Sequence, residues 1–322
     1  MEKLLEITDL HIQFKTERAI VSAVNGVNLT IHKSESLGLV GEAGAGKTTT
    51  AMAILNQLAN NGKVLSGDIK FKGESVFKMS KGQLQKMRGD KISMIFQNPL
   101  TSLNPVFTVG EQIAMVLRHH KKMSAKEARE ATKELLKSVS IPEYRLDDFP
   151  IQFSGGMRQR VGIAAGVACN PELIIADEPT TALDVTIQAQ ILELLKKMQR
   201  EYNTSLLMIT HNLGIISELC ERVAVMYAGR IIEYGTSDEV FRNPMHPYTQ
   251  GLLGALPTLD DQKERLTAIP GRVANPQKLP DGCRFHPRCQ YCKEECKKTP
   301  PTMRMVTENH YVECYLVEES EK

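Results

Sequence analysis

A glycine-rich loop that ends in a lysine and a hydroxyl side chain is the strongest chemical signal in this sequence. Residues 41–48 read Gly-Glu-Ala-Gly-Ala-Gly-Lys-Thr, between an apolar stretch at 37–40 and a predicted helix at 48–58. Glycines free successive backbone amides to point at phosphate oxygens, and the positive end of the helix strengthens that field. In this pattern Lys47 contacts the β- and γ-phosphates and the Thr48 hydroxyl ligates Mg²⁺. We therefore predict a nucleotide site.

Two acidic residues follow a second apolar run. Residues 173–178 read Leu-Ile-Ile-Ala-Asp-Glu, which puts Asp177 at the carboxyl end of a predicted strand, where ligands bind in open α/β sheets. We predict that Asp177 holds Mg²⁺ through water and that Glu178 polarises the attacking water, because phosphoryl transfer depends on positioning and charge stabilisation. Gln97 and His211 end two further strand-like stretches. We expect Gln97 to ligate Mg²⁺ or water and His211 to contact the γ-phosphate.

A second anion site is predicted where Ser154-Gly155-Gly156 opens a helix. The serine hydroxyl and the free amides of the helix start can bind an anion. One nucleotide does not need two γ-phosphate sites in the same chain. We therefore predict a head-to-tail dimer in which each serine site covers the other subunit's glycine-rich loop, with Ala182-Leu183-Asp184 at the interface.

Apolar runs alternate with helical patterns around these motifs, which is typical of a parallel α/β sheet. The short apolar stretches in residues 1–35 predict antiparallel strands. The pattern of residues 98–158 predicts a helical insertion, in which Ser124 and Glu127 form a capping box. The other predicted elements are strands at 37–40, 173–177 and 205–210, helices at 156–168 and 184–201, and a closing hairpin at 223–235. We divide the chain into a nucleotide-binding domain, 1–240, and a separate C-terminal extension, 241–322.

The extension is rich in proline and holds five of the seven cysteines. Cys283, Cys289, Cys296 and Cys314 cluster there, and Cys292 could substitute for Cys289 or Cys296. Four thiolates suit Zn²⁺ or an iron–sulfur cluster, although the spacing is not that of common zinc modules. The third interpretation is that these cysteines are thiols that bind no metal. Metal ligation would supply folding energy to a segment with little core of its own.

Composition excludes several other classes of protein. Apolar residues make up 42% of the 322 residues, which is ordinary for a globular protein. The net charge is +2, tryptophan is absent and aromatic residues are only 5%, so a nucleic acid is not an expected partner. The sequence contains no apolar run long enough to span a bilayer and starts without a signal-like pattern, so we expect a cytosolic or peripherally bound chain.

Taken together, the motifs resemble the nucleotide-binding subunits of ATP-binding cassette (ABC) transporters. The resemblance implies a RecA-like P-loop NTPase core of α/β class, an N-terminal antiparallel β subdomain and a helical signature subdomain. It identifies Walker A at 41–48, the Q-loop at Gln97, the signature at 154–158, Walker B at 173–178, the D-loop at 182–184 and the H-loop at His211. Phe153 and Met157 depart from the common LSGGQ signature, and we read the site as active.

The resemblance implies that Phe14 stacks on adenine. The residues placed against ATP are Phe14, Gly41, Glu42, Ala43, Gly44, Ala45, Gly46, Lys47, Thr48, Thr49, Gln97, Asp177, Ser154, Gly155, Gly156, Met157 and Asp184. Glu178, His211 and Gln97 are the implied catalytic residues, and Thr48 and Gln97 the implied Mg²⁺ ligands.

Stretches 98–112, 155–161, 246–249, 269–271 and 282–285 are similar to the ATPases of oligopeptide and dipeptide permeases. This resemblance covers almost the whole chain and implies a D-type ATPase on the cytoplasmic face of the membrane that energises peptide import. Its implied partners are a related F-type ATPase in a heterodimer, two transmembrane permease subunits and, indirectly, an extracytoplasmic substrate-binding protein. It also implies a [4Fe–4S] cluster on Cys283, Cys289, Cys296 and Cys314.

Other functions stay open at this point. Relatives of this kind also move nickel chelates and some oligosaccharides, and the ATPase subunit does not touch the cargo. A soluble ABC ATPase of DNA repair or translation is a second class, but such proteins carry a coiled-coil insertion or two cassettes. A regulatory or iron–sulfur assembly protein is a third class.

Overall fold

The computed structural model describes residues 2–97, 102–181, 183–255 and 269–317. These residues form two compact units, each built from several segments of the chain. The first unit takes in residues 1–4, 31–36 and 78–209, and the second takes in residues 5–30, 37–77 and 210–322. The division of the chain near residue 240 stays a prediction.

Three parallel strands form the sheet of the first unit. Strand β7 (Leu173–Asp177) pairs with β6 (Ile92–Ile95) on one side and with β8 (Ser205–Thr210) on the other. Every residue of β7 and β8 is buried, which explains why both strands read as continuous apolar runs. The predicted strands at 173–177 and 205–210 are confirmed.

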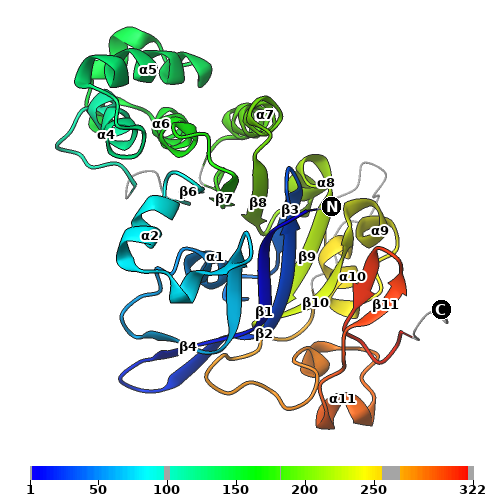
Figure 1. Ribbon diagram of the computed structural model, residues 1–322. Helices are drawn as coiled ribbons and strands as arrows, with labels where there is room; N and C mark the ends of the chain where they lie inside the picture. Colours follow the sequence, from blue (N-terminus) through cyan, green and yellow to red (C-terminus); the bar gives the residue numbers. More distant parts are fainter. Residues whose placement is uncertain (1, 98–101, 182, 256–268, 318–322) are drawn as a thin grey trace. The chain divides into compact units, whose positions relative to one another are not determined.

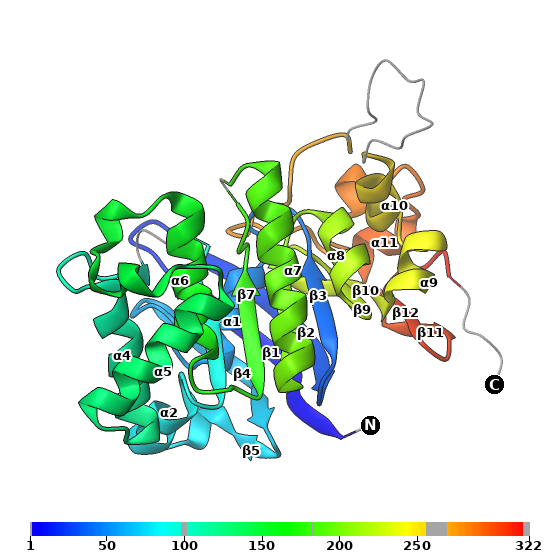
Figure 2. The same cartoon turned by 90° about the horizontal axis from the view of Figure 1, so that it is seen from above.

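Two helices connect these strands, and both begin at a side-chain cap. Helix α6 spans Gly155–Val167 and α7 spans Val185–Tyr202, within a residue or two of the predicted helices. The side chains of Ser154 and Asp184 accept hydrogen bonds from the third backbone amide that follows each of them. Helix α7 runs alongside β7 and β8 (Figures 1 and 2).

The region predicted as a helical insertion contains helices α4 (Val109–Lys121) and α5 (Ala125–Ser138) and two short 3₁₀ turns, Glu143–Asp147 and Pro150–Gln152. The predicted capping box is present at the start of α5. The Ser124 hydroxyl accepts the Glu127 amide at 3.3 Å, and the Ser124 amide donates to the Glu127 carboxylate at 2.8 Å. Residues 98–101 of the predicted insertion lie outside the described residues.

A short 3₁₀ turn, Val76–Lys78, and helix α2 (Lys81–Met87) precede β6.

The second unit contains an N-terminal sheet in the order β2-β1-β4-β5. Its strands are β1 (Lys3–Lys15), β2 (Ile20–His32), β4 (Gly62–Phe71) and β5 (Glu74–Ser75). Strand β4 is antiparallel to both β1 and β5. Residues 1–35 therefore form strands, as predicted.

The glycine-rich loop lies between β3 (Ser36–Val40) and helix α1 (Lys47–Ile54). Strand β3 runs parallel to β9 (Arg222–Tyr227), and β9 forms the predicted hairpin with β10 (Arg230–Thr236). The prediction of a helix to residue 58 is wrong. Helix α1 ends at Ile54 because Asn56 adopts a left-handed conformation, with a φ of 49°, that turns the chain.

The proline-rich segment continues the sheet of the second unit. Strand β12 (His310–Val312) pairs antiparallel with β10, and β11 (Arg304–Thr307) pairs with β12. Helix α9 (Ser237–Arg242) leads into the segment, whose described residues also form α10 (Pro247–Gly254), the 3₁₀ turn His286–Arg288 and α11 (Glu294–Lys298). Helix α8 (Leu213–Leu219) precedes β9. The described helices include none that is both long enough and apolar enough to cross a membrane.

We predict that shortening a central side chain of β7 destabilises the protein. Ile175 is fully buried, so Ile175→Ala leaves a cavity and should lower the free energy of unfolding by about 2–5 kcal/mol. Val185 is 81% exposed, and Val185→Ala should change that free energy by less than about 0.5 kcal/mol. Urea denaturation followed by circular dichroism measures both. Equal effects of the two variants would contradict a buried β7.

Candidate active site

The glycine-rich loop packs directly against the backbone of two strands. A Cβ atom at Gly41 would lie 2.1 Å from the Met226 carbonyl oxygen in β9. A Cβ atom at Gly46, where φ is +104°, would lie 2.4 Å from the Ala23 carbonyl oxygen in β2. Glycine is required at both positions because any side chain would collide with a backbone that cannot move aside.

Lys47 begins helix α1, and its ammonium group folds back over the loop. Its Nζ atom donates to the carbonyl oxygens of Gly41 at 2.6 Å and Glu42 at 3.1 Å. The first turn of α1 contains no acidic side chain, so the positive end of the helix is not neutralised locally. The Thr48 side chain in that turn is exposed, as are Ala43 and Gly44. The loop thus presents free backbone and a hydroxyl group at a helix start, which is an arrangement that binds phosphate.

Two side chains from the C-terminal segment contact the same loop at Glu42. The Tyr248 hydroxyl accepts the Glu42 backbone amide at 2.9 Å. The Arg288 guanidinium donates to both carboxylate oxygens of Glu42, at 2.7 and 3.2 Å. Burial by itself would lower the pKa of Arg288, but its hydrogen bonds to Glu42 and Tyr227 hold that pKa above its ordinary value. Sequence reasoning missed both residues; Tyr248 lies in the stretch 246–249 that resembles peptide permease ATPases, and no sequence signal pointed to Arg288.

In the first unit, the structure brings Gln97 and Glu178 together. The Gln97 amide donates to Glu178 Oε2 at 3.0 Å, and the Thr181 hydroxyl donates to the same oxygen at 2.9 Å. Asp177 is buried at the end of β7, while Gln97 is exposed just after β6. Two donors therefore fix one carboxylate oxygen of Glu178 at the carboxyl edge of the sheet.

The backbone of Glu178 is held in an uncommon conformation. Its φ of 45° lies in the left-handed region, which costs a non-glycine residue energy. The Glu178 amide donates to the Ile209 carbonyl oxygen of β8 at 2.8 Å, which fixes the residue in this state. Strained residues persist where their surroundings determine them, and they concentrate at functional sites.

The predicted signature segment begins α6 beside the start of α7. The Ser154 hydroxyl accepts the Met157 amide at 3.3 Å, and Asp184 Oδ1 accepts the Ile187 amide at 3.0 Å. A Cβ atom at Gly156 would lie 2.6 Å from the Ile187 side chain, so this glycine lets the two helix starts meet. Ala182 of the predicted D-loop lies outside the described residues.

Phe14 and His211 belong to the second unit. Phe14 lies in β1 opposite Gly62 of β4, and a Cβ atom at Gly62 would lie 2.6 Å from the Phe14 ring. His211 is exposed directly after β8. The adenine contact of Phe14 and the phosphate contact of His211 stay predictions. So does the joint action of the glycine-rich loop with Gln97, Asp177, Glu178 and Ser154 of the first unit.

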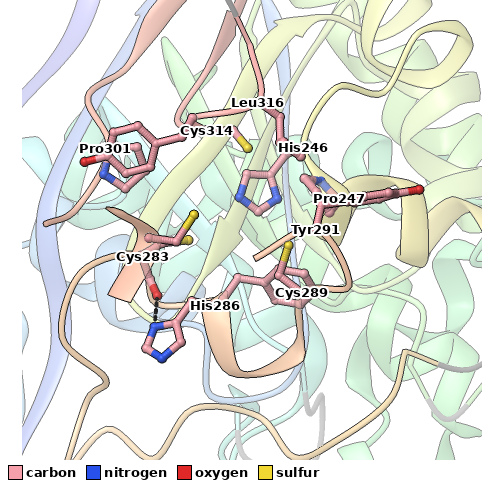
Figure 3. Close-up of a pocket in the computed structure, with 12 residues that line it drawn as sticks. His246, Pro247, Cys283, His286, Cys289, Tyr291, Pro301, Cys314 and Leu316 are labelled. Carbon is pink, nitrogen blue, oxygen red and sulfur yellow. Dashed lines mark hydrogen bonds between the residues drawn. The ribbon is translucent and has the colours of Figure 1, made fainter. Parts of the chain in front are cut away.

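Four cysteines of the C-terminal segment line one pocket with aromatic and proline side chains (Figure 3). They are Cys283, Cys289, Cys296 and Cys314. Burial raises the pKa of the Cys283 thiol to about 12, and burial also raises the pKa values of Cys289 and Cys314. His246, which also lines the pocket, is buried, and burial lowers its pKa to about 4. The Cys283, Cys289 and Cys314 thiols and the His246 ring are therefore neutral at ordinary pH.

Comparisons with known proteins agree with the geometry of the glycine-rich loop and the strand ends. Residues 24–181 match the family model described as "ABC transporter", and residues 232–296 match "Oligopeptide/dipeptide transporter, C-terminal region". A solved structure, the post-hydrolysis dimer of the ATP-binding cassette MJ0796 bound to ADP and Pi, has a TM-score of 0.66 and 29% identity. That similarity covers 72% of this chain and 98% of the solved one. The class is therefore that of ABC ATPases.

Curated relatives narrow the class to one family. The chain is 47% identical over 312 residues to the oligopeptide transport ATP-binding protein OppD of Haemophilus influenzae, covering 96% of this chain and 95% of the relative. It is 47% identical over 322 residues to AppD of Bacillus subtilis, covering 99% and 98%. It is 48% identical over 302 residues to OppD of Escherichia coli K12, covering 93% and 89%. The chain belongs to the oligopeptide/dipeptide transporter family of ABC ATP-binding proteins, and it is an ATPase that binds ATP.

The prediction of a [4Fe–4S] cluster is wrong. Within the described ranges, no three or more His, Cys, Asp and Glu side chains are arranged to hold a metal ion. Cys283, Cys289, Cys296 and Cys314 line the same pocket but do not form such a group. The relatives are named as oligopeptide transport ATP-binding proteins, with no iron–sulfur protein among those compared above. Clustering in sequence indicated metal ligation, but the folded segment places these thiols among aromatic and proline side chains without arranging them as ligands.

We predict that Gly46→Ala abolishes ATP binding. The added methyl group would collide with the Ala23 backbone oxygen and would hold φ in a region that costs about 1–2 kcal/mol. Binding of a fluorescent ATP analogue measures the effect.

Gly73→Ala is the matched control. Gly73 also has a positive φ, +82°, but a Cβ atom there would meet no described atom within 4 Å. This variant should bear only the backbone strain and should still bind ATP. Wild-type affinity in Gly46→Ala would contradict the close packing of the loop on β2.

Proposed function

We propose that this chain is the ATP-hydrolysing subunit that energises an importer of dipeptides or oligopeptides. The observation that carries the proposal is identity of 47% over nearly the whole of both chains to oligopeptide transport ATP-binding proteins. The match of residues 232–296 to the C-terminal region of oligopeptide/dipeptide transporters supports the same cargo class.

The glycine-rich loop would bind the ATP phosphates. Backbone amides of residues 41–48 and the start of α1 would surround them, and Lys47 would leave its carbonyl partners to meet the β- and γ-phosphates. The hydroxyl of Thr48 and the amide oxygen of Gln97, with Asp177 through water, are oxygen donors of the kind that Mg²⁺ prefers. Bound Mg²⁺ would supply charge stabilisation to the transferring phosphoryl group.

Glu178 would orient and polarise the attacking water. Support comes from its place at the carboxyl end of β7 and from the two donors, Gln97 and Thr181, that fix one of its oxygens. His211 would contact the γ-phosphate. A carboxylate in this role acts on the chemical step rather than on binding.

A second subunit would complete each site. Ser154 and the amides that begin α6 would bind the γ-phosphate held by the partner's loop, and Asp184 would lie at the interface. The solved cassette MJ0796 is described as dimeric, which supports this arrangement. We propose a related F-type ATPase as the partner in a heterodimer.

The helical region would contact two membrane permease subunits at the cytoplasmic face of the membrane. Several apolar side chains just before α4 and between α5 and α6 are exposed, among them Val106 at 71%, Tyr144 at 78% and Ile151 at 83%. Exposed apolar groups that gather in one region mark interaction sites. An extracytoplasmic substrate-binding protein would deliver the cargo to the permease.

We predict that Glu178→Gln retains ATP binding and lowers turnover by about 100-fold or more, because a general base contributes that much to a rate. Phosphate release and ATP affinity are measured on the same preparation. Glu172→Gln is a control at the opposite end of β7, where Glu172 pairs with Lys91 at 3.7 Å, and it should keep its turnover. Undiminished turnover in Glu178→Gln would contradict the proposed role.

The cargo is tested with the assembled transporter. We expect that short peptides, added with the cognate binding protein to vesicles that contain both ATPases and both permease subunits, increase ATP hydrolysis. Stimulation by a nickel chelate or an oligosaccharide alone would contradict the peptide assignment and leave the ATPase assignment standing. Hydrolysis that does not respond to the membrane subunits would contradict the transporter assignment.

A further inference from the structure

Glu42 of the glycine-rich loop is held from two directions by the C-terminal segment. Tyr248 of α10 accepts its backbone amide at 2.9 Å, and Arg288 forms a two-pronged ion pair with its carboxylate. Charge-assisted pairs with this fork geometry are stronger and more specific in direction than single hydrogen bonds. The contact therefore fixes both the backbone and the side chain of one loop residue.

Both partners of Glu42 are themselves fixed by their surroundings. The Arg288 side chain is only 5% exposed, and its Nε atom donates to the Pro270 carbonyl oxygen at 2.9 Å. Tyr248 is fully buried, with its ring centroid 4.6 Å from that of Tyr227 and 5.4 Å from that of Phe285. This arrangement differs from a surface ion pair, in which mobile side chains and water weaken the interaction.

The Tyr248 contact also sets the direction of the peptide group between Gly41 and Glu42. A trans peptide is planar, and its N–H and C=O point in opposite directions. Because the Glu42 amide points at Tyr248, the Gly41 carbonyl oxygen points away from it. That oxygen accepts the Lys47 ammonium at 2.6 Å. The C-terminal segment thus orients the group on which Lys47 rests.

We propose that Arg288 and Tyr248 are positioning residues for ATP binding, which act through Glu42 on the loop and on Lys47. The segment at residues 232–296 then serves the nucleotide site in addition to any structural role. This proposal rests on ATP binding by the chain and not on the identity of the cargo. Lysine cannot replace Arg288 fully, because an ammonium group lacks the planar fork that meets both carboxylate oxygens.

Affinity for ATP compared with affinity for AMP tests the proposal. Arg288→Gln removes a charge-assisted contact that holds Glu42, so it should raise the Kd for ATP about tenfold. Tyr248→Phe and Glu42→Gln should act in the same direction, and Arg288→Lys should recover part of the loss. AMP lacks the phosphates that Lys47 meets, so its Kd should stay within about twofold of the wild-type value. The double variant Arg288→Gln/Glu42→Gln should bind ATP no more weakly than the weaker single variant.

Glu313→Gln is the matched control. Glu313 also forms a two-pronged pair between the C-terminal segment and a core strand, with Arg230 of β10 at 2.7 and 2.9 Å, but neither residue belongs to the loop. This variant should lower the melting temperature and leave the Kd for ATP unchanged. Isothermal titration calorimetry gives both Kd values, and thermal melting reports the folded fraction of each variant.

Two results would overturn the proposal. If Arg288→Gln and Glu42→Gln lower the melting temperature but leave the Kd for ATP unchanged, the contacts are structural only. If ATP and AMP weaken equally, the effect does not pass through Lys47. If Arg288 variants fail to fold, Glu42→Gln carries the test, because the Glu42 side chain is 27% exposed and the substitution keeps its shape. Tyr248→Phe serves as well, because it removes only a hydroxyl group. A wild-type chain that binds no ATP would contradict the ATPase assignment instead.

Discussion

The direct packing of the glycine-rich loop on strand backbones is the constraint on which the nucleotide-binding loop depends. Gly41 and Gly46 leave no room for a Cβ atom against β9 and β2, so the position of the loop follows the position of those strands. The turn between β9 and β10 adds to this support, because the Gly229 amide donates to the Ala45 carbonyl oxygen at 2.9 Å. Asn25 of β2 in turn donates to the Ala228 carbonyl oxygen at 3.1 Å. The turn at Ala228 and Gly229 thus supports the phosphate-binding backbone from one side.

Much of the fold could be predicted from the sequence because its signals are local. Buried parallel strands such as β7 and β8 read as continuous apolar runs, and the helix starts at Ser154 and Asp184 carry side chains that cap. The end of α1 could not be predicted, because Asn56 stops that helix without a proline or glycine nearby. The pairing of β12 with β10 depends on residues almost eighty positions apart, and no local pattern encodes it.

Some residues of the site could likewise be predicted from the sequence, and others could not. Gln97 and Glu178 each follow an apolar strand, and the structure joins them by a hydrogen bond, while their roles in hydrolysis stay predictions. Arg288 and Tyr248 are 246 and 206 positions from Glu42, so their contacts with it carry no sequence signal. For the four clustered cysteines, clustering indicated thiolate ligands, whereas the arrangement of their sulfur atoms depends on how the segment folds. Chemistry that depends on a local sequence motif could therefore be predicted. Chemistry that depends on residues far apart in the sequence, which only the fold brings together, could not.

The pairing of β12 with β10 has a consequence for how this protein can vary. A strand at the edge of a sheet exposes unpaired amides and carbonyls that invite association with other chains. The hairpin of β11 and β12 covers β10, and His310 of β12 meets the buried Glu233 of β10 at 2.8 Å. A chain cut after β10 would expose that edge and leave the Glu233 carboxylate without its histidine partner. The C-terminal segment and the strand that it covers are therefore coupled, and replacing one of them alone would have to preserve both the strand pairing and a partner for the Glu233 carboxylate.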